Sequence, residues 1–391
     1  MGKTYSIWFA NIIEYLNEHP EFFKKNNKLN KEKLRILWIT PLRALSYDTK
    51  QSLQAAIDEL NLNWTVDIRS GDTSESDRKK QLRDLPTCLI TTPESLSLIL
   101  TYKNSDELLS GIRCVVVDEW HELLSSKRGT MTELVLARIR KFNPDVRTWG
   151  LSATLGNLEI AAQTLFGANN DNYKIIKGLE PKKIVIESLL PIEIERFPKA
   201  GHLGIKMLPQ VVDEIGQSGS ILVFTNTRSQ AEIWFQEILD YDPYLAGDTA
   251  IHHSSIDKEK RIYVEDALKN GKLKNVICTS SLDLGVDFAP VDRVMQIGSI
   301  KGIARMLQRA GRSGHQPHKE SRLIFVPTNS FELIEIAAAR DAIAKNDIEP
   351  RIPQSKPYDV LAQHLVTIAI GLGFTYQEMY EEIISLWQKS I

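Results

Sequence analysis

The chain has 391 residues, of which 42% are hydrophobic and 25% are charged, so it is long enough for two or three globular domains and is neither disordered nor fibrous in composition. Lys and Arg total 48 against 50 for Asp and Glu, a net charge of −2, so a global basic field is excluded and any nucleic-acid binding depends on local patches. No apolar run is long enough to cross a membrane, and the N-terminus lacks a secretory signal, so we expect a cytoplasmic protein with no membrane partner.

The first part of the chain alternates short β-branched strands with amphipathic helices. Strands are predicted at Leu34–Thr40, Thr65–Arg69, Cys88–Thr91, Arg113–Val117 and Val146–Leu151, with helices such as Ser46–Leu60 and Thr130–Lys141 between them. This alternation predicts an α/β domain with a doubly wound parallel sheet over residues 1–177.

Residues 178–204 are rich in proline and glycine and contain one strand pattern, so they are interpreted as a linker. The alternation then resumes over residues 205–349, which predicts a second doubly wound parallel sheet. Its strands are predicted at Ser220–Thr225, Thr249–Ile251, Asn275–Thr279, Arg293–Ile297 and Arg322–Val326. Residues 350–391 contain only two predicted helices, Asp359–Gly371 and Tyr376–Gln388, and are interpreted as the start of a helical domain too short to complete its own core.

A phosphate-binding loop is suggested by Gly2-Lys3-Thr4, which stands directly before an amphipathic helix. In such a loop, backbone amides and the Lys hold the phosphates, and a Ser or Thr hydroxyl binds Mg²⁺. The complete pattern GxxxxGK[ST] needs more residues before Gly2 than Met1 supplies, so we expect this chain to lack the first strand and most of the loop. An arbitrary N-terminus is the alternative for the triplet taken alone.

Asp118-Glu119 follows a strongly apolar strand, so both carboxylates are expected at the carboxyl edge of the sheet, where α/β proteins bind ligands. One carboxylate suits Mg²⁺ and the other suits a base that activates water, whereas a solvated acidic turn is the alternative. Ser152 and Thr154 follow the next strand along the chain. Their hydroxyls are expected to hydrogen-bond the cluster of Asp118, Glu119 and His121, although an ordinary turn or helix cap is the alternative.

Lys301–Arg322 is a strongly basic segment of the second predicted domain. Gln308, Arg309 and Arg312 lie on a short predicted helix that glycines close. Arginines that reach a triphosphate from the opposite domain, when the two domains close, would stabilise charge on the transferred phosphoryl group. A solvated basic helix, or a patch that binds only nucleic-acid phosphates, is the alternative.

Hydroxyls, amides and arginines also follow other strands, at helix N-termini that suit phosphates without reading bases. The residues concerned are Arg43 and Thr92 in the first domain and Thr227, Arg228, Thr279 and Ser280 in the second. Gly285 and Asp287 belong to the segment Thr279–Asp287, whose small residues suit close approach to a phosphate and whose aspartates suit an Arg or a ribose hydroxyl. Ordinary helix capping is the alternative at each position.

The chain resembles the superfamily 2 helicases through an ordered set of motifs: GKT, TPLRAL, TTPESL, DEWH, SAT, FTNTRSQAE, TSSLDLGVDF and QRAGRSGH. Trp120 in the Asp-Glu box, the segment Ser281–Phe288 and His315 narrow the resemblance to the large helicase-related family, in its ligase-associated DEXH-box branch. The resemblance implies two tandem RecA-like lobes, followed by the start of a winged-helix domain.

The resemblance also implies an ATP-driven motor that moves 3′ to 5′ on single-stranded DNA, unwinds duplexes and acts in DNA repair. It implies that ATP is bound by Gly2, Lys3, Thr4, Gly285 and Asp287, that Mg²⁺ is bound by Thr4 and Asp118, and that Glu119, Gln308, Arg309 and Arg312 complete the catalytic site. His121, Ser152 and Thr154 would couple hydrolysis to the DNA contacts made by Arg43, Thr92, Thr227, Arg228, Thr279 and Ser280. The implied partners are single-stranded DNA and duplex junctions, with a DNA ligase and a nuclease of the same pathway.

Two alternatives stay open from the sequence. One is a two-lobe nucleic-acid clamp without ATPase activity in this truncated form, and the other is an RNA helicase, because backbone contacts do not by themselves distinguish the sugars. The presence of Asp118, Glu119, Arg309 and Arg312 favours the enzyme, since a clamp needs neither a base that activates water nor arginines that face a triphosphate.

Overall fold

A computed structural model describes residues 2–23, 33–153, 155–168, 170, 172–178, 183–191, 203–283, 291–314 and 320–387. The chain divides into two compact units. The first contains residues 1–176 together with 350–391, and the second contains residues 177–349. None of the helices in the described ranges is both long enough and apolar enough to cross a membrane.

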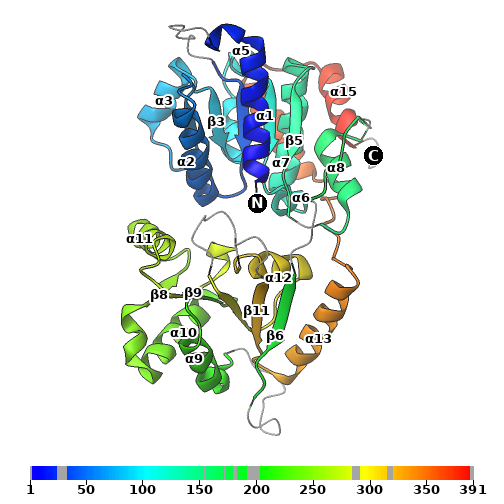
Figure 1. Cartoon of the computed structure of the whole chain (residues 1–391). Coiled ribbons are helices and arrows are strands. Elements are labelled where there is room, and N and C mark those ends of the chain that lie inside the picture. Colours follow the sequence, from blue (N-terminus) through cyan, green and yellow to red (C-terminus); the bar gives the residue numbers. More distant parts are fainter. Residues whose placement is uncertain are drawn as a thin grey trace. The chain divides into compact units, whose positions relative to one another are not determined.

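The first unit has a five-stranded parallel sheet in the order β2-β3-β1-β4-β5, with helices on both faces (Figure 1). Its strands are β1 Ile36–Ile39, β2 Val66–Arg69, β3 Cys88–Thr91, β4 Cys114–Val117 and β5 Arg147–Gly150. Its helices are α1 Lys3–Glu18, α2 Arg43–Glu59, α3 Glu75–Arg83, α4 Pro93–Ile99, α5 Ser105–Leu109, α6 Trp120–Leu124, α7 Lys127–Phe142, α8 Leu158–Phe166, α14 Tyr358–Ile370 and α15 Tyr376–Trp387, with a 3₁₀ turn η1 at Pro20–Phe23.

The central strands β1, β3 and β4 are buried along their whole length, as a parallel sheet covered on both faces requires. Successive side chains of each strand point to opposite faces, so two cores form. Trp38 of β1 packs with Trp8 of α1 in one core, whereas Val115 of β4 packs with Leu136 of α7 in the other.

The register of the strands brings their carboxyl ends to one edge of the sheet. Ile39 of β1 is paired with Thr91 of β3 and with Val117 of β4. The residues that follow these three strands therefore start next to one another. This is the edge at which the sequence places most of its candidate site residues.

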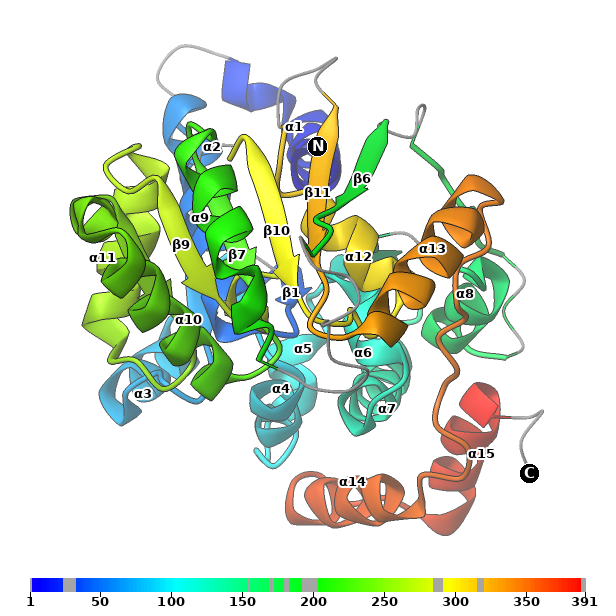
Figure 2. The ribbon, with the colours of Figure 1, turned by 90° about the horizontal axis from the view of Figure 1, so that it is seen from below.

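The second unit has a six-stranded parallel sheet in the order β6-β11-β10-β7-β9-β8. Its strands are β6 Ile184–Ser188, β7 Ile221–Phe224, β8 Thr249–His252, β9 Asn275–Cys278, β10 Arg293–Ile297 and β11 Ser321–Val326. Its helices are α9 Leu208–Gly216, α10 Arg228–Tyr241, α11 Lys258–Lys269, α12 Ile303–Ala310 and α13 Ser330–Ala344, with 3₁₀ turns η3 Ile205–Met207, η4 Pro243–Gly247 and η5 Ser280–Leu282. Residues of α9 and α10 fill the core on one face, and residues of α11, α12 and α13 fill the core on the other (Figure 2).

The predicted fold class, two doubly wound parallel sheets in tandem, is confirmed. The ranges Cys88–Thr91 and Arg293–Ile297 coincide with β3 and β10, and the other predicted strands differ only at their ends. The strand pattern inside residues 178–204 is β6, which pairs with β11 and is an edge strand of the second sheet. Residues 179–182 and 192–202 of this predicted linker lie outside the described residues, and the predicted domain boundaries stay predictions.

The two C-terminal helices complete their packing against α7 of the first unit (Figure 1 and Figure 2). Val360 of α14 and Leu386 of α15 share a small core with Leu134. Arg138 of α7 forms an ion pair of 3.1 Å with Glu382 of α15, and both side chains are almost fully buried. The sequence predicts that residues 350–391 are too few to complete a core of their own. Helices α14 and α15 instead pack on a second apolar face of α7 and share the core of the first unit.

Glu133 of α7 is the basis of a stability prediction. Its carboxylate is buried and accepts a hydrogen bond of 3.3 Å from Trp387 Nε1, and burial raises its pKa to about 8. The folded state therefore holds this proton more tightly than the unfolded chain, whose pKa is near 4.5. The contribution of Glu133 to the free energy of unfolding is largest at low pH and is lost as the pH rises from about 4.5 to about 8.

Glu133→Gln is expected to remove this loss, because glutamine resembles the protonated acid and does not titrate. Near pH 8 the variant should therefore be more stable than the wild type, by on the order of a few kcal/mol of unfolding free energy, since each pKa unit corresponds to about 1.4 kcal/mol. Melting temperatures measured between pH 5 and pH 8 should show this as a smaller decrease with rising pH in the variant. Glu381→Gln, an exposed position on α15, is the matched control and should follow the wild type. An unchanged pH dependence in Glu133→Gln would contradict the assignment.

Candidate catalytic site

Asp118 lies directly after β4, at the edge where the strand ends meet. It is 7% exposed. One carboxylate oxygen accepts a hydrogen bond of 3.3 Å from Trp38 Nε1, and the other accepts one of 2.9 Å from the Glu119 backbone N–H. Burial raises the pKa of Asp118, and these two donors and Lys3 oppose that rise. The carboxylate is therefore held in one orientation by groups from two neighbouring strands.

Glu119 has a left-handed backbone, with φ 46° and ψ 46°, and is the N-cap residue of α6. A residue other than glycine in this conformation typically costs on the order of 1–3 kcal/mol and persists only where its surroundings impose it. The sharp turn lets α6 start immediately after Asp118. It leaves the Glu119 side chain partly exposed.

His121 joins this cluster to the segment after β5. Its Nδ1 accepts a hydrogen bond of 3.2 Å from the Ala153 N–H and lies 3.4 Å from Glu119 Oε2. Burial, together with the nearby positive charges of Arg351 and Lys3, lowers the pKa of His121 to about 4. The imidazole is therefore neutral at neutral pH, with its hydrogen on Nε2, and Nδ1 accepts the hydrogen bond from the Ala153 N–H.

Lys3 also reaches the segment after β5. Its Nζ donates a hydrogen bond of 2.7 Å to the Ser152 carbonyl oxygen. The helix expected after Gly2-Lys3-Thr4 is present as α1, and Gly2 precedes it with φ 85°, a conformation that favours glycine. Lys3, Asp118, Glu119, His121 and Ser152 are therefore brought to one region. The hydrogen bond expected from the Ser152 hydroxyl to the carboxylate cluster is not formed, because the backbone of residues 152–153 makes these contacts and the Ser152 hydroxyl oxygen is buried without a partner among the described residues. Thr154 lies outside the described residues.

The residues present fit a magnesium ion bound together with phosphates. Within the described ranges no group of three or more His, Cys, Asp or Glu side chains could hold a metal alone. Mg²⁺ commonly needs only one or two carboxylates, with phosphate oxygens and water completing its shell. Asp118, whose two oxygens each accept only one hydrogen bond from the protein in the contacts above, has the oxygen chemistry for this role, and Thr4 adds a hydroxyl in the first turn of α1.

Arg43 and Thr92, expected to contact a nucleic-acid backbone, follow β1 and β3. The Arg43 guanidinium is exposed and pairs with Asp72. Thr92 is buried and its hydroxyl caps α4, which is the ordinary helix capping that the sequence left open as the alternative. Arg128 at the start of α7 connects the two segments, because it donates to the Pro41 carbonyl oxygen and pairs with Glu94.

In the second unit, Thr227 and Arg228 follow β7, while Thr279 and Ser280 follow the neighbouring strand β9. The Thr227 hydroxyl accepts a hydrogen bond of 3.1 Å from the Gln230 N–H and caps α10, and Arg228 bonds the Ser255 hydroxyl. Thr279 is the N-cap residue of η5, and Ser280 is exposed. Both segments therefore start from the same sheet edge.

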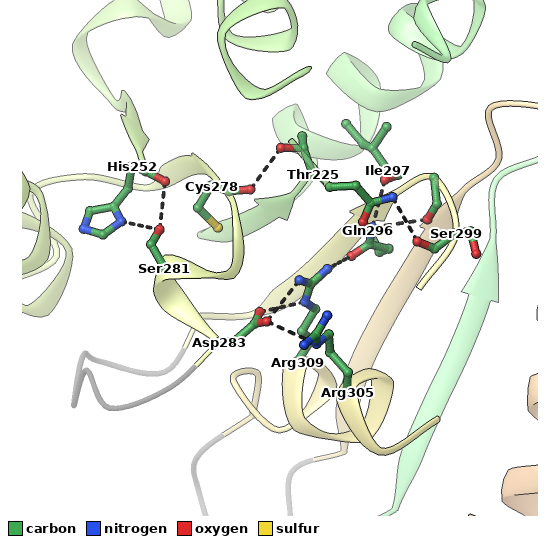
Figure 3. Close-up of polar contacts among 12 residues, drawn as sticks. Thr225, His252, Cys278, Ser281, Asp283, Gln296, Ile297, Ser299, Arg305 and Arg309 are labelled. Atoms are coloured by element: carbon green, nitrogen blue, oxygen red, sulfur yellow. Dashed lines mark hydrogen bonds and ion pairs between the residues drawn. The ribbon is translucent and has the colours of Figure 1, made fainter. Parts of the chain in front are cut away.

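Arg309 is buried inside the second unit, in a polar cluster (Figure 3). Its guanidinium makes two hydrogen bonds to the Asp283 carboxylate, of 2.7 and 3.1 Å, and a third to Gln296 Oε1. Gln308 is half-buried on α12, and Arg312 follows the helix in the turn that Gly311 begins. Gly285 and Asp287 lie outside the described residues.

Sequence reasoning missed Trp38, Gln296 and Arg128 as partners of the site. Their partners are distant in sequence, and each of these residues reads as an ordinary strand or helix residue in its local pattern. Asp283 was partly anticipated, because the aspartates of Thr279–Asp287 suggested an arginine partner.

Family models match the chain in three parts. A DEAD/DEAH box helicase model matches residues 1–161, a helicase conserved C-terminal domain matches residues 204–316, and the winged helix domain of large helicase-related proteins matches residues 341–388. With the two parallel sheets, these matches define a core of the superfamily 2 helicases, with two RecA-like lobes followed by a winged-helix domain.

Individual relatives narrow the assignment. The chain is 35% identical over 395 residues to the ATP-dependent helicase Lhr-Core of Methanocaldococcus jannaschii, covering 98% of this chain and 45% of the relative. It is 30% identical to the Lhr helicase/uracil glycosylase of Escherichia coli, covering 98% of this chain and 28% of the relative. The structure of Mycobacterium smegmatis helicase Lhr bound to ssDNA and AMP-PNP matches with a TM-score of 0.80 and 31% identity, over 90% of this chain and 48% of that one. The chain belongs to the large helicase-related (Lhr) family, and it spans less than half the length of these relatives.

Proposed function

We propose that this chain contains the motor of an ATP-dependent DNA helicase that moves 3′ to 5′ on single-stranded DNA in DNA repair. The observation that carries the proposal is the cluster of Lys3, Asp118, Glu119 and His121 at the carboxyl edge of the first sheet. A ligase and a nuclease of the same pathway, and the ligase-associated branch of the family, belong to the same proposal.

In this function Glu119 is the base that takes a proton from the attacking water, and its partly exposed carboxylate is compatible with that role. Lys3 would leave the Ser152 carbonyl for a phosphate oxygen, exchanging one polar partner for a charged one. Asp118 and Thr4 would hold Mg²⁺, which supplies charge neutralisation at the phosphates when it is bound.

His121 is proposed to transmit the state of this site to the segment after β5. Its neutral Nδ1 accepts from the Ala153 N–H and faces Glu119 Oε2, so a shift of Glu119 changes the position that residues 152–153 prefer. Ser152 and Thr154 are proposed to carry this change toward the DNA contacts. The ordinary turn stays the competing explanation for their hydroxyls.

The DNA backbone is proposed to follow Arg43, Thr92, Thr227, Arg228, Thr279 and Ser280. These residues lie at strand ends and helix N-termini of the two sheets, where hydroxyls and arginines suit phosphate oxygens. The Mycobacterium smegmatis relative bound to ssDNA and AMP-PNP supports both ligands. Gly2, Gly285, Asp287, Gln308 and Arg312 are proposed to complete nucleotide binding and turnover.

The test is ATP hydrolysis by the purified protein, measured with and without Mg²⁺, single-stranded DNA and single-stranded RNA. We expect hydrolysis to require Mg²⁺ and to be stimulated by DNA. A fluorescent duplex with a 3′ or a 5′ single-stranded tail then reports the direction, and only the 3′ tail should support unwinding.

The same measurement decides between the alternatives. Stimulation by RNA in preference to DNA would favour an RNA helicase. DNA binding by the protein without any ATP hydrolysis would favour a clamp and overturn the enzymatic proposal. In both cases DNA or RNA affinity should fall as salt rises, because contacts to phosphates release counterions.

A further inference from the structure

Arg309 uses its guanidinium within the second unit. It is 2% exposed. Nε and Nη2 both donate to Asp283, and Nη1 donates to Gln296 Oε1 (Figure 3). The guanidinium also lies over the ring of Phe224, 4.5 Å from the ring centre. The Arg309 guanidinium is thus bound along two edges and on one face, so it can bind a phosphate only if these contacts break.

Breaking these contacts is unfavourable because it leaves Asp283 buried without its partner. Arg305, one turn earlier on α12, lies 3.6 Å from the same carboxylate, but its side chain is 34% exposed and cannot replace the two-bond contact of Arg309. Arg312, by contrast, follows the end of α12 and is only partly buried.

The partners of Arg309 belong to three segments, and two of these segments also carry the proposed DNA contacts. Asp283 is the C-cap residue of η5, which begins with Ser280 directly after Thr279. Phe224 is the last residue of β7, which precedes Thr227 and Arg228. Gln296 lies on β10, paired in register with Phe224. Arg309 therefore connects α12, the helix that precedes Arg312, to the ends of β7 and β9, where the proposed DNA contacts lie.

We infer that Arg309 is a positioning residue, which holds Thr279 and Ser280 in place for DNA through Asp283, and that Arg312 is the arginine that acts on the phosphates. This inference rests on the proposed function. The inference assigns different roles to Arg309 and Arg312, to which the sequence analysis gave the same role.

The experiment compares Arg309→Lys, Asp283→Asn and the double variant with the wild-type protein. Lysine keeps the charge but cannot form the two-bond contact. We expect each single variant to weaken single-stranded DNA binding without nucleotide, and to raise the DNA concentration that half-saturates ATP hydrolysis, by about tenfold. The double variant should be no weaker than either single variant, because both remove the same contact.

Arg138→Lys is the matched control. It disturbs another buried ion pair, with Glu382, in which the side chains are 4% and 6% exposed. It should lower the melting temperature as Arg309→Lys does while leaving the DNA half-saturation unchanged. If Arg309→Lys does not fold, Asp283→Asn and Gln296→Ala are measured instead, and both should weaken DNA binding and raise the DNA half-saturation. Neither Asp283 nor Gln296 would contact ATP even if Arg309 were the catalytic arginine, so a loss of DNA binding in these variants supports the positioning role.

The inference is overturned if Arg309→Lys keeps wild-type DNA binding and half-saturation while its maximal turnover collapses. It is also overturned if Asp283→Asn leaves all three quantities unchanged. A wild-type protein that binds no single-stranded DNA would instead remove the proposed function itself, and the inference with it.

Discussion

Glu119→Gln should reduce ATP turnover by about 10²–10⁴-fold and leave ATP binding nearly intact. The amide has nearly the shape of the carboxylate but cannot take a proton from water. Binding depends instead on Lys3, on the backbone amides of the phosphate loop and on Asp118, which the substitution leaves in place. Steady-state ATP hydrolysis measures the turnover, and titration with a non-hydrolysable ATP analogue measures the binding.

Glu107→Gln is a suitable control for this substitution, because it removes an exposed carboxylate from α5 of the same unit and should hydrolyse ATP at the wild-type rate. DNA binding without nucleotide should be unchanged in both variants. Turnover of Glu119→Gln at the wild-type rate would refute the assignment of the base.

Arg312→Ala should lower DNA-stimulated hydrolysis by roughly 10³-fold or more, by comparison with arginines that stabilise charge in other phosphoryl-transfer enzymes. The reason is that its guanidinium is proposed to act on charge that develops only during transfer, so the loss should appear in maximal turnover. Single-stranded DNA binding without nucleotide should stay close to the wild type, because Thr227, Arg228, Thr279 and Ser280 are untouched.

Lys301→Ala serves as the control, because it removes an exposed positive charge just before α12 and should have little effect on turnover. ATP and DNA should also each tighten the binding of the other by the same factor in the wild type, as thermodynamic linkage requires. If Arg312→Ala lost DNA binding and kept its ATPase rate, the basic segment would be a nucleic-acid patch, the alternative left open by the sequence.

The sequence by itself determined the elements and the edge at which the site lies. Apolar runs such as Cys114–Val117 and Ile221–Phe224 are short and alternate with helical patterns, so they predict buried parallel strands without any knowledge of their neighbours. Asp118-Glu119 follows such a run directly, and parallel strands end at a common edge. Local order along the chain was therefore sufficient to predict these two carboxylates at a ligand-binding edge.

Only the tertiary structure decided which partners these residues have. Trp38 and Asp118 meet because β1 and β4 are neighbours in the sheet, and Arg309 is buried because α12 packs where Asp283 and Gln296 converge. Residue periodicity indicates which face of an element is buried but not which element covers it, so a basic helix with a buried arginine has the same pattern as one with an exposed arginine. The packing of α14 and α15 on α7 follows the same rule, since their apolar faces fit any complementary surface until the fold supplies one.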